Sequence, residues 1–123
     1  MVFGRKKKQA PGFEYDYTYE VQIAGVTHDF RQVAVSGLRE GQSLDLVPEP
    51  TNPHDPHAVA VFAKGKTVGY VPAFKSEMVS EFIAKGKTVD ARVLAIEPFI
   101  VDGGYEALGV RMVLGLGRRD SQE

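Results

Sequence analysis

The residues best suited to chemistry lie in one proline-rich polar loop, PEPTNPHDPH at positions 48–57. Four of the seven prolines of the chain lie within nine residues of this loop. Their fixed backbone angles reduce the entropy that is lost when a ligand orders the loop. Asp55 offers a carboxylate, Asn52 an amide, and His54 and His57 offer imidazoles. A rigid loop with these groups is typical of a binding site.

Asn52 and Asp55 have two interpretations. In the first they are turn residues, because Asn-Pro and Asp-Pro favour turns and both side chains cap nearby backbone groups. In the second, Asp55 accepts a hydrogen bond from a ligand hydroxyl while Asn52 braces the loop. A carboxylate suits a free sugar hydroxyl and repels a phosphate in its place. Such a site would prefer the end of a strand to an internal linkage.

Catalysis has little support in the sequence. The chain has no cysteine, no Gly-x-Ser-x-Gly motif and no phosphate-binding Gly-x-x-x-x-Gly-Lys-Ser/Thr motif. His28, His54 and His57 could supply an open zinc site, although loop histidines are more often plain polar surface. We therefore expect no catalytic residues, no metal site and no cofactor. A metal-dependent hydrolase that uses the three histidines remains an alternative.

The elements that must position the loop are mostly strands. Period-two alternation predicts strands at 15–23, 43–48, 58–63, 67–72, 89–96 and 105–114. Lys64-Gly65 supplies the tight turn of the central hairpin, and residues 98–104 form a turn region.

Two helices complete this pattern. Residues 73–85 form the clearer one, ended by Gly86, and its apolar stripe should face the core: Phe74, Met78, Val79, Phe82 and Ile83. Residues 30–36 form a short helix with Asp29 as its N-cap, or else a strand. The sequence predicts a mainly β fold with six strands, packed as a small β-barrel or a strongly curved sheet, with a helix after the central hairpin.

Composition bounds the class of protein. The 123 residues, 43% hydrophobic and 25% charged, suit one globular domain. We expect a disordered basic arm at 1–12, a domain at 13–117 and a polar tail at 118–123. No apolar run is long enough to cross a bilayer, and the absence of cysteine fits a reducing cytoplasm. We therefore expect a cytoplasmic protein without a membrane partner.

The net charge of −1 is unevenly distributed along the chain. Residues 5–8 carry +4, which leaves about −5 on the globular part. A protein that holds long nucleic acid by its phosphates needs a basic face. Any nucleic-acid role should therefore be local, at a short or terminal feature.

The loop and its hairpin resemble the signature of the HIRAN domain family. The resemblance rests on NPHDPHAVAV at 52–61 and VGYVP at 68–72, with Ile23-Ala24-Gly25-Val26 matching the end of the first strand. It covers roughly residues 17–115. It implies a small β-barrel related to the OB-fold that binds the 3′ end of single-stranded DNA. In that family an aspartate contacts the terminal 3′-hydroxyl, aromatic residues hold the terminal bases, and basic residues contact phosphates.

The resemblance carries roles onto individual residues. Asp55 would take the hydroxyl, Asn52 would support the loop, and His54 and His28 would occupy stacking positions. Tyr70 would lie on the phosphate side.

Other positions depart from the family pattern. Tyr105 would replace an aromatic of a late strand. Basic residues are expected near Thr27 and Ala73, where this chain has none, and Lys75 or Arg111 would substitute for them.

The function that follows is a non-catalytic module that recognises single-stranded DNA at its 3′-hydroxyl end, in DNA repair or replication-fork processing. Two stacking contacts and one hydrogen bond to a charged acceptor predict micromolar or weaker affinity. The alternative is a protein-interaction or regulatory module on the same fold with little DNA affinity. A helicase or nuclease is a possible protein partner.

Overall fold

The computed structural model describes residues 14–119, so the basic arm expected at 1–12 lies outside the described residues. In chain order the elements are β1 (Glu14–Gln22), α2 (Arg31–Ser36), β2 (Ser43–Pro48), β3 (Val59–Ala63), β4 (Lys66–Tyr70), α3 (Ala73–Ala84), β5 (Val89–Ile100) and β6 (Glu106–Arg119). This order confirms the mainly β fold class, with a helix directly after the β3–β4 hairpin. β6 reaches Arg119 and so extends into the segment expected to be a polar tail.

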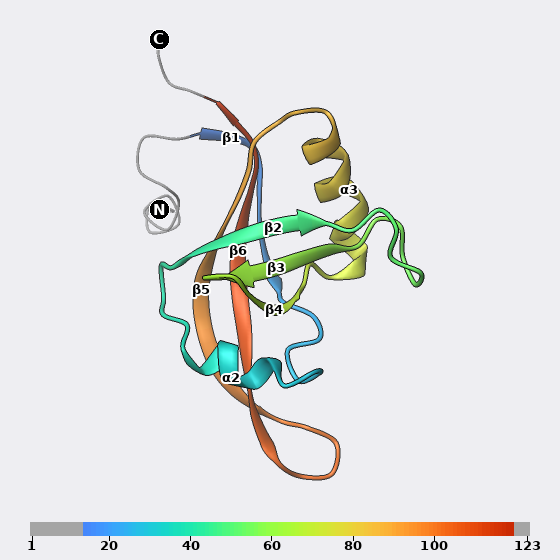
Figure 1. The fold of residues 1–123 in the computed structure, drawn as a ribbon. Helices are drawn as coiled ribbons and strands as arrows, with labels where there is room; N and C mark the ends of the chain where they lie inside the picture. The colour runs from blue at the N-terminus through green and yellow to red at the C-terminus, as the bar shows by residue number, and fades with distance from the viewer. Residues whose placement is uncertain (1–13, 120–123) are drawn as a thin grey trace.

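The six strands form one antiparallel sheet in the order β1-β6-β5-β2-β3-β4. Strands β2, β3 and β4 cross in front of the long strands β5 and β6, with α3 beside one end and α2 at the other (Figure 1). The sheet is strongly curved in this way, but its hydrogen-bond ladder does not close into a continuous barrel.

The two edge strands approach each other next to residue 24. Among the described residues, Ala24 and Tyr70 form an isolated bridge, with N–H to carbonyl distances of 2.8 and 2.9 Å. Gly69 makes this approach possible, because a Cβ atom at that position would collide with the Ala24 carbonyl oxygen and lie 2.6 Å from Ile23 Cγ2. The bridge therefore joins the two edges of an OB-like fold, although the sheet itself remains open.

The core lies inside this curve. Its largest fully buried side chains come from both halves of the sheet and from both helices: Met112, Leu114, Leu116, Val35, Val59, Val61, Val68, Val79 and Val110. The central position of β6 explains why its inward side chains are buried along most of its length. Burial of this apolar surface is the main stabilising contribution.

The end of β5 differs from the prediction. Residues 98–100 were expected in a turn, but Pro98, Phe99 and Ile100 pair with Leu108, Ala107 and Glu106 of β6. Proline is tolerated in a strand whose outer edge has no neighbour. The pairing of β5 with β2 ends at Arg92, so Pro98 removes no ladder hydrogen bond to β2.

Helix α3 forms as predicted but presents one unexpected side chain. It ends at Gly86 (φ +78), where the Gly86 and Lys87 N–H groups bind the carbonyls of Ile83 and Phe82 in a Schellman arrangement. Val79 is buried, whereas Phe74 is 75% exposed. The prediction of a single buried stripe was wrong at Phe74, which lines an open groove with Tyr17, whereas Ser76 in the same first turn is buried.

Helix α2 also forms, but its start was predicted wrongly. Asp29 makes no N-cap; Phe30 occupies that position, in the left-handed region and without a side-chain cap. Asp29 is itself at φ +54. Its carboxylate instead accepts a hydrogen bond from Arg31 at 3.3 Å.

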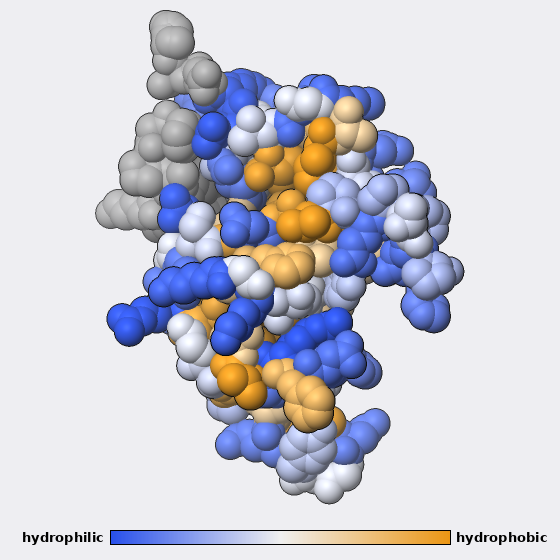
Figure 2. Space-filling view, in the orientation of Figure 1, coloured by the Kyte–Doolittle hydropathy of each residue, from blue (hydrophilic) through white to orange (hydrophobic). Residues whose placement is uncertain are grey.

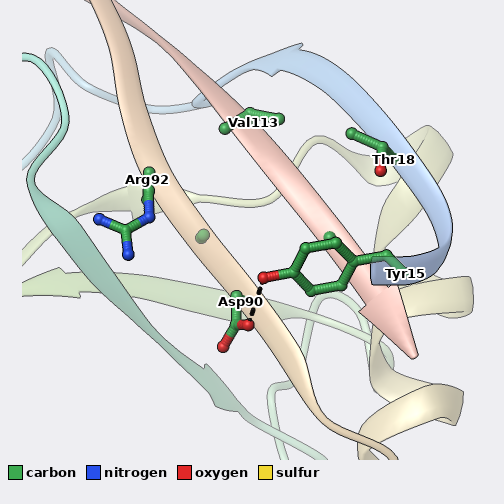
Figure 3. A pocket seen from close by; sticks show the side chains of 7 residues that line it. Tyr15, Thr18, Asp90, Arg92 and Val113 are labelled. Atoms are coloured by element: carbon green, nitrogen blue, oxygen red, sulfur yellow. Dashed lines mark hydrogen bonds between the residues drawn. The ribbon is translucent and has the colours of Figure 1, made fainter. Parts of the chain in front are cut away.

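Tyr15 joins β1 to β5 across β6. Its ring lies over Gly115, and its hydroxyl donates a 2.6 Å hydrogen bond to Asp90 Oδ2 (Figure 3). Burial, together with this carboxylate, raises the pKa of Tyr15. The space beside the ring is only about 10 Å³, so this contact is structural and leaves no room for a ligand.

Neither of the described helices is long and apolar enough to span a membrane.

Candidate nucleic-acid interface

A cleft of about 430 Å³ lies where the 48–57 loop, the end of β4 and the start of α3 meet. Asn52, His54 and Asp55 line it from the loop, and Tyr70 and Ala73 line it from the other side. Asp29, from the turn before α2, and Arg31, the first residue of α2, complete the wall. Residues far apart in the sequence therefore share one open site.

Asn52 holds the shape of the loop. Its Oδ1 accepts hydrogen bonds from the backbone N–H groups of His54 (2.8 Å) and Asp55 (3.1 Å). Its Nδ2 donates to Glu49 Oε1 at 3.0 Å. The bracing role predicted for Asn52 therefore agrees with its contacts, which are those of an Asx turn.

Asp55 divides its two carboxylate oxygens between two tasks. Oδ1 accepts the backbone N–H of His57 at 2.8 Å, as turn chemistry requires. Oδ2 has only a long contact of 3.5 Å from Ser76 Oγ and belongs to a side chain that lines the cleft. One oxygen thus fixes the carboxylate, and the other retains acceptor capacity for a ligand.

Tyr70 connects the loop to the sheet. Its hydroxyl donates to Glu49 Oε1 at 2.9 Å, the same oxygen that Asn52 binds. Burial raises the pKa of Tyr70, and the hydrogen bond and negative charge of Glu49 raise it further. Tyr70 therefore stays protonated at neutral pH and keeps its hydrogen bond to the loop.

Arg31 is the residue of this cleft that the sequence analysis missed. Its guanidinium lies 5.2 Å from the centroid of the Tyr70 ring and donates to the Gly25 carbonyl at 2.8 Å. Its side chain is 13% exposed. A usable signal existed, because Arg31 is the one lysine or arginine between Ile23 and Gly37. Arg31 places a positive charge in the cleft where family-pattern positions near Thr27 and Ala73 lack one.

Two predicted residues line a different cleft. Thr27 and His28 face a space of about 300 Å³ whose far side is formed by Pro98 and Phe99 of β5. Gly25 borders this second cleft and also contacts Arg31, so the two clefts are neighbours.

The remaining predicted residues lie outside both clefts. Lys75 places its ammonium 3.6 Å from the Tyr19 ring centroid, and Arg111 pairs with Glu97 at 2.6 Å. Tyr105 is exposed in the turn between β5 and β6. The structure therefore brings Asn52, His54, Asp55 and Tyr70 together with Arg31, but not with these three residues.

The histidines do not form a cluster. His54 lines the first cleft and His28 the second. Within residues 14–119, no group of three or more histidine, cysteine or acidic side chains could hold a metal ion. The hydrolase alternative thus has no metal centre on which to rest in the described part of the chain.

The chemistry of the first cleft suits a ligand with both a hydroxyl and a phosphate. Asp55 can accept a hydrogen bond from the hydroxyl, and Arg31 can contact an anionic group. The carboxylates of Asp29 and Asp55 would repel a ligand that brings several negative charges into the cleft. This balance favours a ligand with few phosphates near its terminus.

Comparison with known proteins agrees with this fold. Two crystal structures are similar over 85% of this chain. A protein from Lactobacillus plantarum shows 17% identity, a TM-score of 0.60 and 99% coverage of its own chain. The HIRAN domain of human HLTF shows 15% identity, a TM-score of 0.57 and 81% coverage.

The search of curated proteins found no match. The HIRAN domain family model matches residues 16–99, which is more than half of the chain and includes the loop, the hairpin and α3. This protein belongs to the HIRAN domain family.

Proposed function

We propose that this protein is a non-catalytic module that binds single-stranded DNA at a free 3′-hydroxyl end, in DNA repair or replication-fork processing. Family membership supports nucleic-acid binding. The preference for an end rests on one observation: the carboxylate of Asp55 belongs to a side chain that lines the cleft, and only its Oδ1 is held by the His57 N–H.

The terminal hydroxyl would donate to Asp55 Oδ2. A phosphate at the same place would bring its negative charge against this carboxylate. An internal nucleotide has a phosphodiester in place of the free hydroxyl and meets the same repulsion. The site therefore selects a terminus by charge, while Arg31 attracts the phosphate of the preceding linkage.

The test compares two oligonucleotides that differ only at the 3′ end, one with a hydroxyl and one with a phosphate. Each carries a 5′ fluorophore, and binding is measured by anisotropy. We expect the hydroxyl form to bind with micromolar or weaker affinity. The phosphate form should bind at least about 10-fold more weakly than the hydroxyl form, since a hydrogen bond to a charged group contributes about 1.5–3 kcal/mol. Equal affinity for the two forms would contradict the role of Asp55.

Asp55→Asn gives the matched variant. The amide keeps an oxygen for the His57 N–H but loses the charge. We expect weaker binding of the 3′-hydroxyl oligonucleotide and loss of the discrimination against 3′-phosphate. Asp45→Asn, which removes an exposed carboxylate of β2 outside the cleft, should leave both affinities unchanged.

The acidic globular part favours one second candidate, a protein-interaction module on the same fold. Its net charge of about −5 opposes contact with extended nucleic acid. Two results together would support this candidate. The protein would bind neither oligonucleotide, and it would capture a protein partner such as a helicase or nuclease equally well with and without Asp55→Ala.

A further inference from the structure

The segment before α2 contains an unusual turn. Arg31 N–H binds the His28 carbonyl at 3.0 Å, and the two residues between them, Asp29 (φ +54) and Phe30 (φ +64), are both left-handed. This is the backbone of a two-residue turn of the I′ type, in which glycine, asparagine and aspartate are favoured. Asp29 suits its place, whereas a phenylalanine at the second position is strongly disfavoured.

Packing does not explain the choice of phenylalanine. Phe30 is 91% exposed, more than any other large hydrophobic side chain in the described part of the chain. Its ring thus contributes little to the core, and its backbone opposes folding. A position that is unfavourable in both respects indicates a role outside stability.

The location of the turn suggests that role. Asp29 and Arg31, on either side of Phe30, line the cleft that contains Asp55. His28, at the start of the turn, lines the neighbouring cleft. Phe30 therefore projects from the segment that the two clefts share. Figure 2 shows apolar residues exposed at this end of the molecule, around α2 and the β5–β6 hairpin.

We propose that Phe30 is a base-stacking residue for the nucleotide that precedes the bound terminus, an inference that rests on the proposed function. The ring of Phe30 would lie against a base as the strand leaves the Asp55 cleft and passes Arg31. Stacking needs an accessible aromatic face and tolerates every base, because each base has a π-face. The left-handed turn holds this face away from the core, and the hydrogen bond from Arg31 to Gly25 fixes the turn in place.

Phe30→Gly separates stability from binding. Glycine suits the left-handed turn, so the variant should unfold at a higher urea concentration than the wild type. The same variant should bind the 3′-hydroxyl oligonucleotide about 5-fold or more weakly, the loss expected for one stacked base. Phe30→Tyr keeps an aromatic face and should retain wild-type affinity.

Phe74→Ala is the matched control. Phe74 is another exposed phenyl group, and it lines a separate groove between α3 and β1. Its removal should leave the affinity unchanged. An equal loss in Phe74→Ala and Phe30→Gly would show that exposed apolar area in general drives binding, and it would overturn the assignment to Phe30.

A spectroscopic measurement locates the contact. An oligonucleotide with 2-aminopurine next to its 3′-terminal base should change fluorescence on binding to the wild type and Phe30→Tyr, but much less on binding to Phe30→Gly at saturation. An unchanged affinity and fluorescence response in Phe30→Gly would overturn the inference.

The two proposals fail in different ways. If the wild type binds no oligonucleotide, or binds hydroxyl and phosphate ends equally, the proposed function fails. If Phe30→Gly keeps full affinity while the wild type discriminates between the two ends, only the role of Phe30 is wrong.

Discussion

Arg31 has structural contacts of its own in addition to the phosphate contact that we propose for it. It donates to Gly25, lies beside the Tyr70 ring and lines the Asp55 cleft. These contacts hold the guanidinium in place, so the proposed phosphate contact would cost less conformational entropy. Asp29 pairs with the same guanidinium but is largely exposed, and solvent weakens that competition.

Arg31→Gln should reduce DNA affinity and its dependence on salt. Loss of one phosphate contact lowers the slope of log affinity against log salt by about 0.7 for a single strand. The measurement is anisotropy over a series of salt concentrations, with thermal unfolding to confirm that the variant is folded. Arg39→Gln removes the same charge from an exposed position and should leave the slope unchanged. An unaltered slope in Arg31→Gln would show that Arg31 contacts no phosphate.

At the residue scale, the sequence predicted contacts between residues close in the chain better than it predicted which distant residues share a site. Asn52 and Asp55 were accessible to prediction because their turn contacts lie within three residues along the chain. Arg31 was missed although it is the one lysine or arginine between Ile23 and Gly37, because its place in the cleft depends on left-handed backbone angles at Asp29 and Phe30, and phenylalanine disfavours them. His54 and His28 were expected at two stacking positions, and they line two neighbouring clefts.

At the scale of elements, a side chain of α2 makes the backbone hydrogen bonds of β6 where β1 no longer pairs with it. Beyond the end of β1, the backbone of Leu108 pairs with Gln32 of α2. Leu108 N–H donates to Gln32 Oε1 at 2.8 Å, and Gln32 Nε2 donates to the Leu108 carbonyl at 2.9 Å. The amide thus acts as a short substitute for a neighbouring strand and fixes α2, and with it the Asp29–Arg31 segment, against the sheet.

Gln32→Ala should lower the free energy of unfolding by about 1–3 kcal/mol, because it leaves two partly buried backbone groups of Leu108 without this partner. Urea denaturation followed by circular dichroism measures the change. Gln42→Ala removes a glutamine whose side-chain hydrogen bond, from the Arg39 N–H, is exposed, and it should change stability by less than about 0.5 kcal/mol. Equal effects in the two variants would contradict the role of Gln32.

Element types were largely predictable, and element ends were not. The alternation at 58–63 and 67–72 and the Lys64-Gly65 turn gave the hairpin correctly, because these signals are local. The end of β5 was missed since Pro98 is a strong turn signal, and only the open outer edge of the strand makes it acceptable there. Phe74 matched a helical stripe, but the sequence could not show that the core ends before it.

At the scale of the whole molecule, the fold depends on how closely the two edges of the sheet approach. The isolated bridge between Ala24 and Tyr70 joins them, and both residues line the Asp55 cleft. Gly69 permits this approach, yet a sequence read one element at a time shows only a glycine within a strand. The strand pattern predicted a small barrel or a strongly curved sheet, and the described residues form the curved sheet, whose two edges meet at the Ala24–Tyr70 bridge.

Gly69→Ala should destabilise the protein by about 1–3 kcal/mol, because the added methyl group meets the backbone of Ala24 and the side chain of Ile23. It should also weaken oligonucleotide binding, since the cleft includes Ala24 and Tyr70. Chemical denaturation and anisotropy test the two effects. Gly37→Ala is the control, since its φ of −93° suits alanine and the added methyl group would lie 3.7 Å from the Ala34 carbonyl oxygen. Wild-type stability in Gly69→Ala would show that the approach is not needed.

The bridge between Ala24 and Tyr70 lies within the wall of the proposed binding cleft, because both residues line it. Arg31 donates to Gly25, next to Ala24, and contacts the Tyr70 ring, while the loop that carries Asp55 is bonded to Tyr70 through Glu49. By thermodynamic linkage, a strand end that binds only when the two sheet edges are joined would stabilise the bridge by the same free energy with which the bridge favours binding.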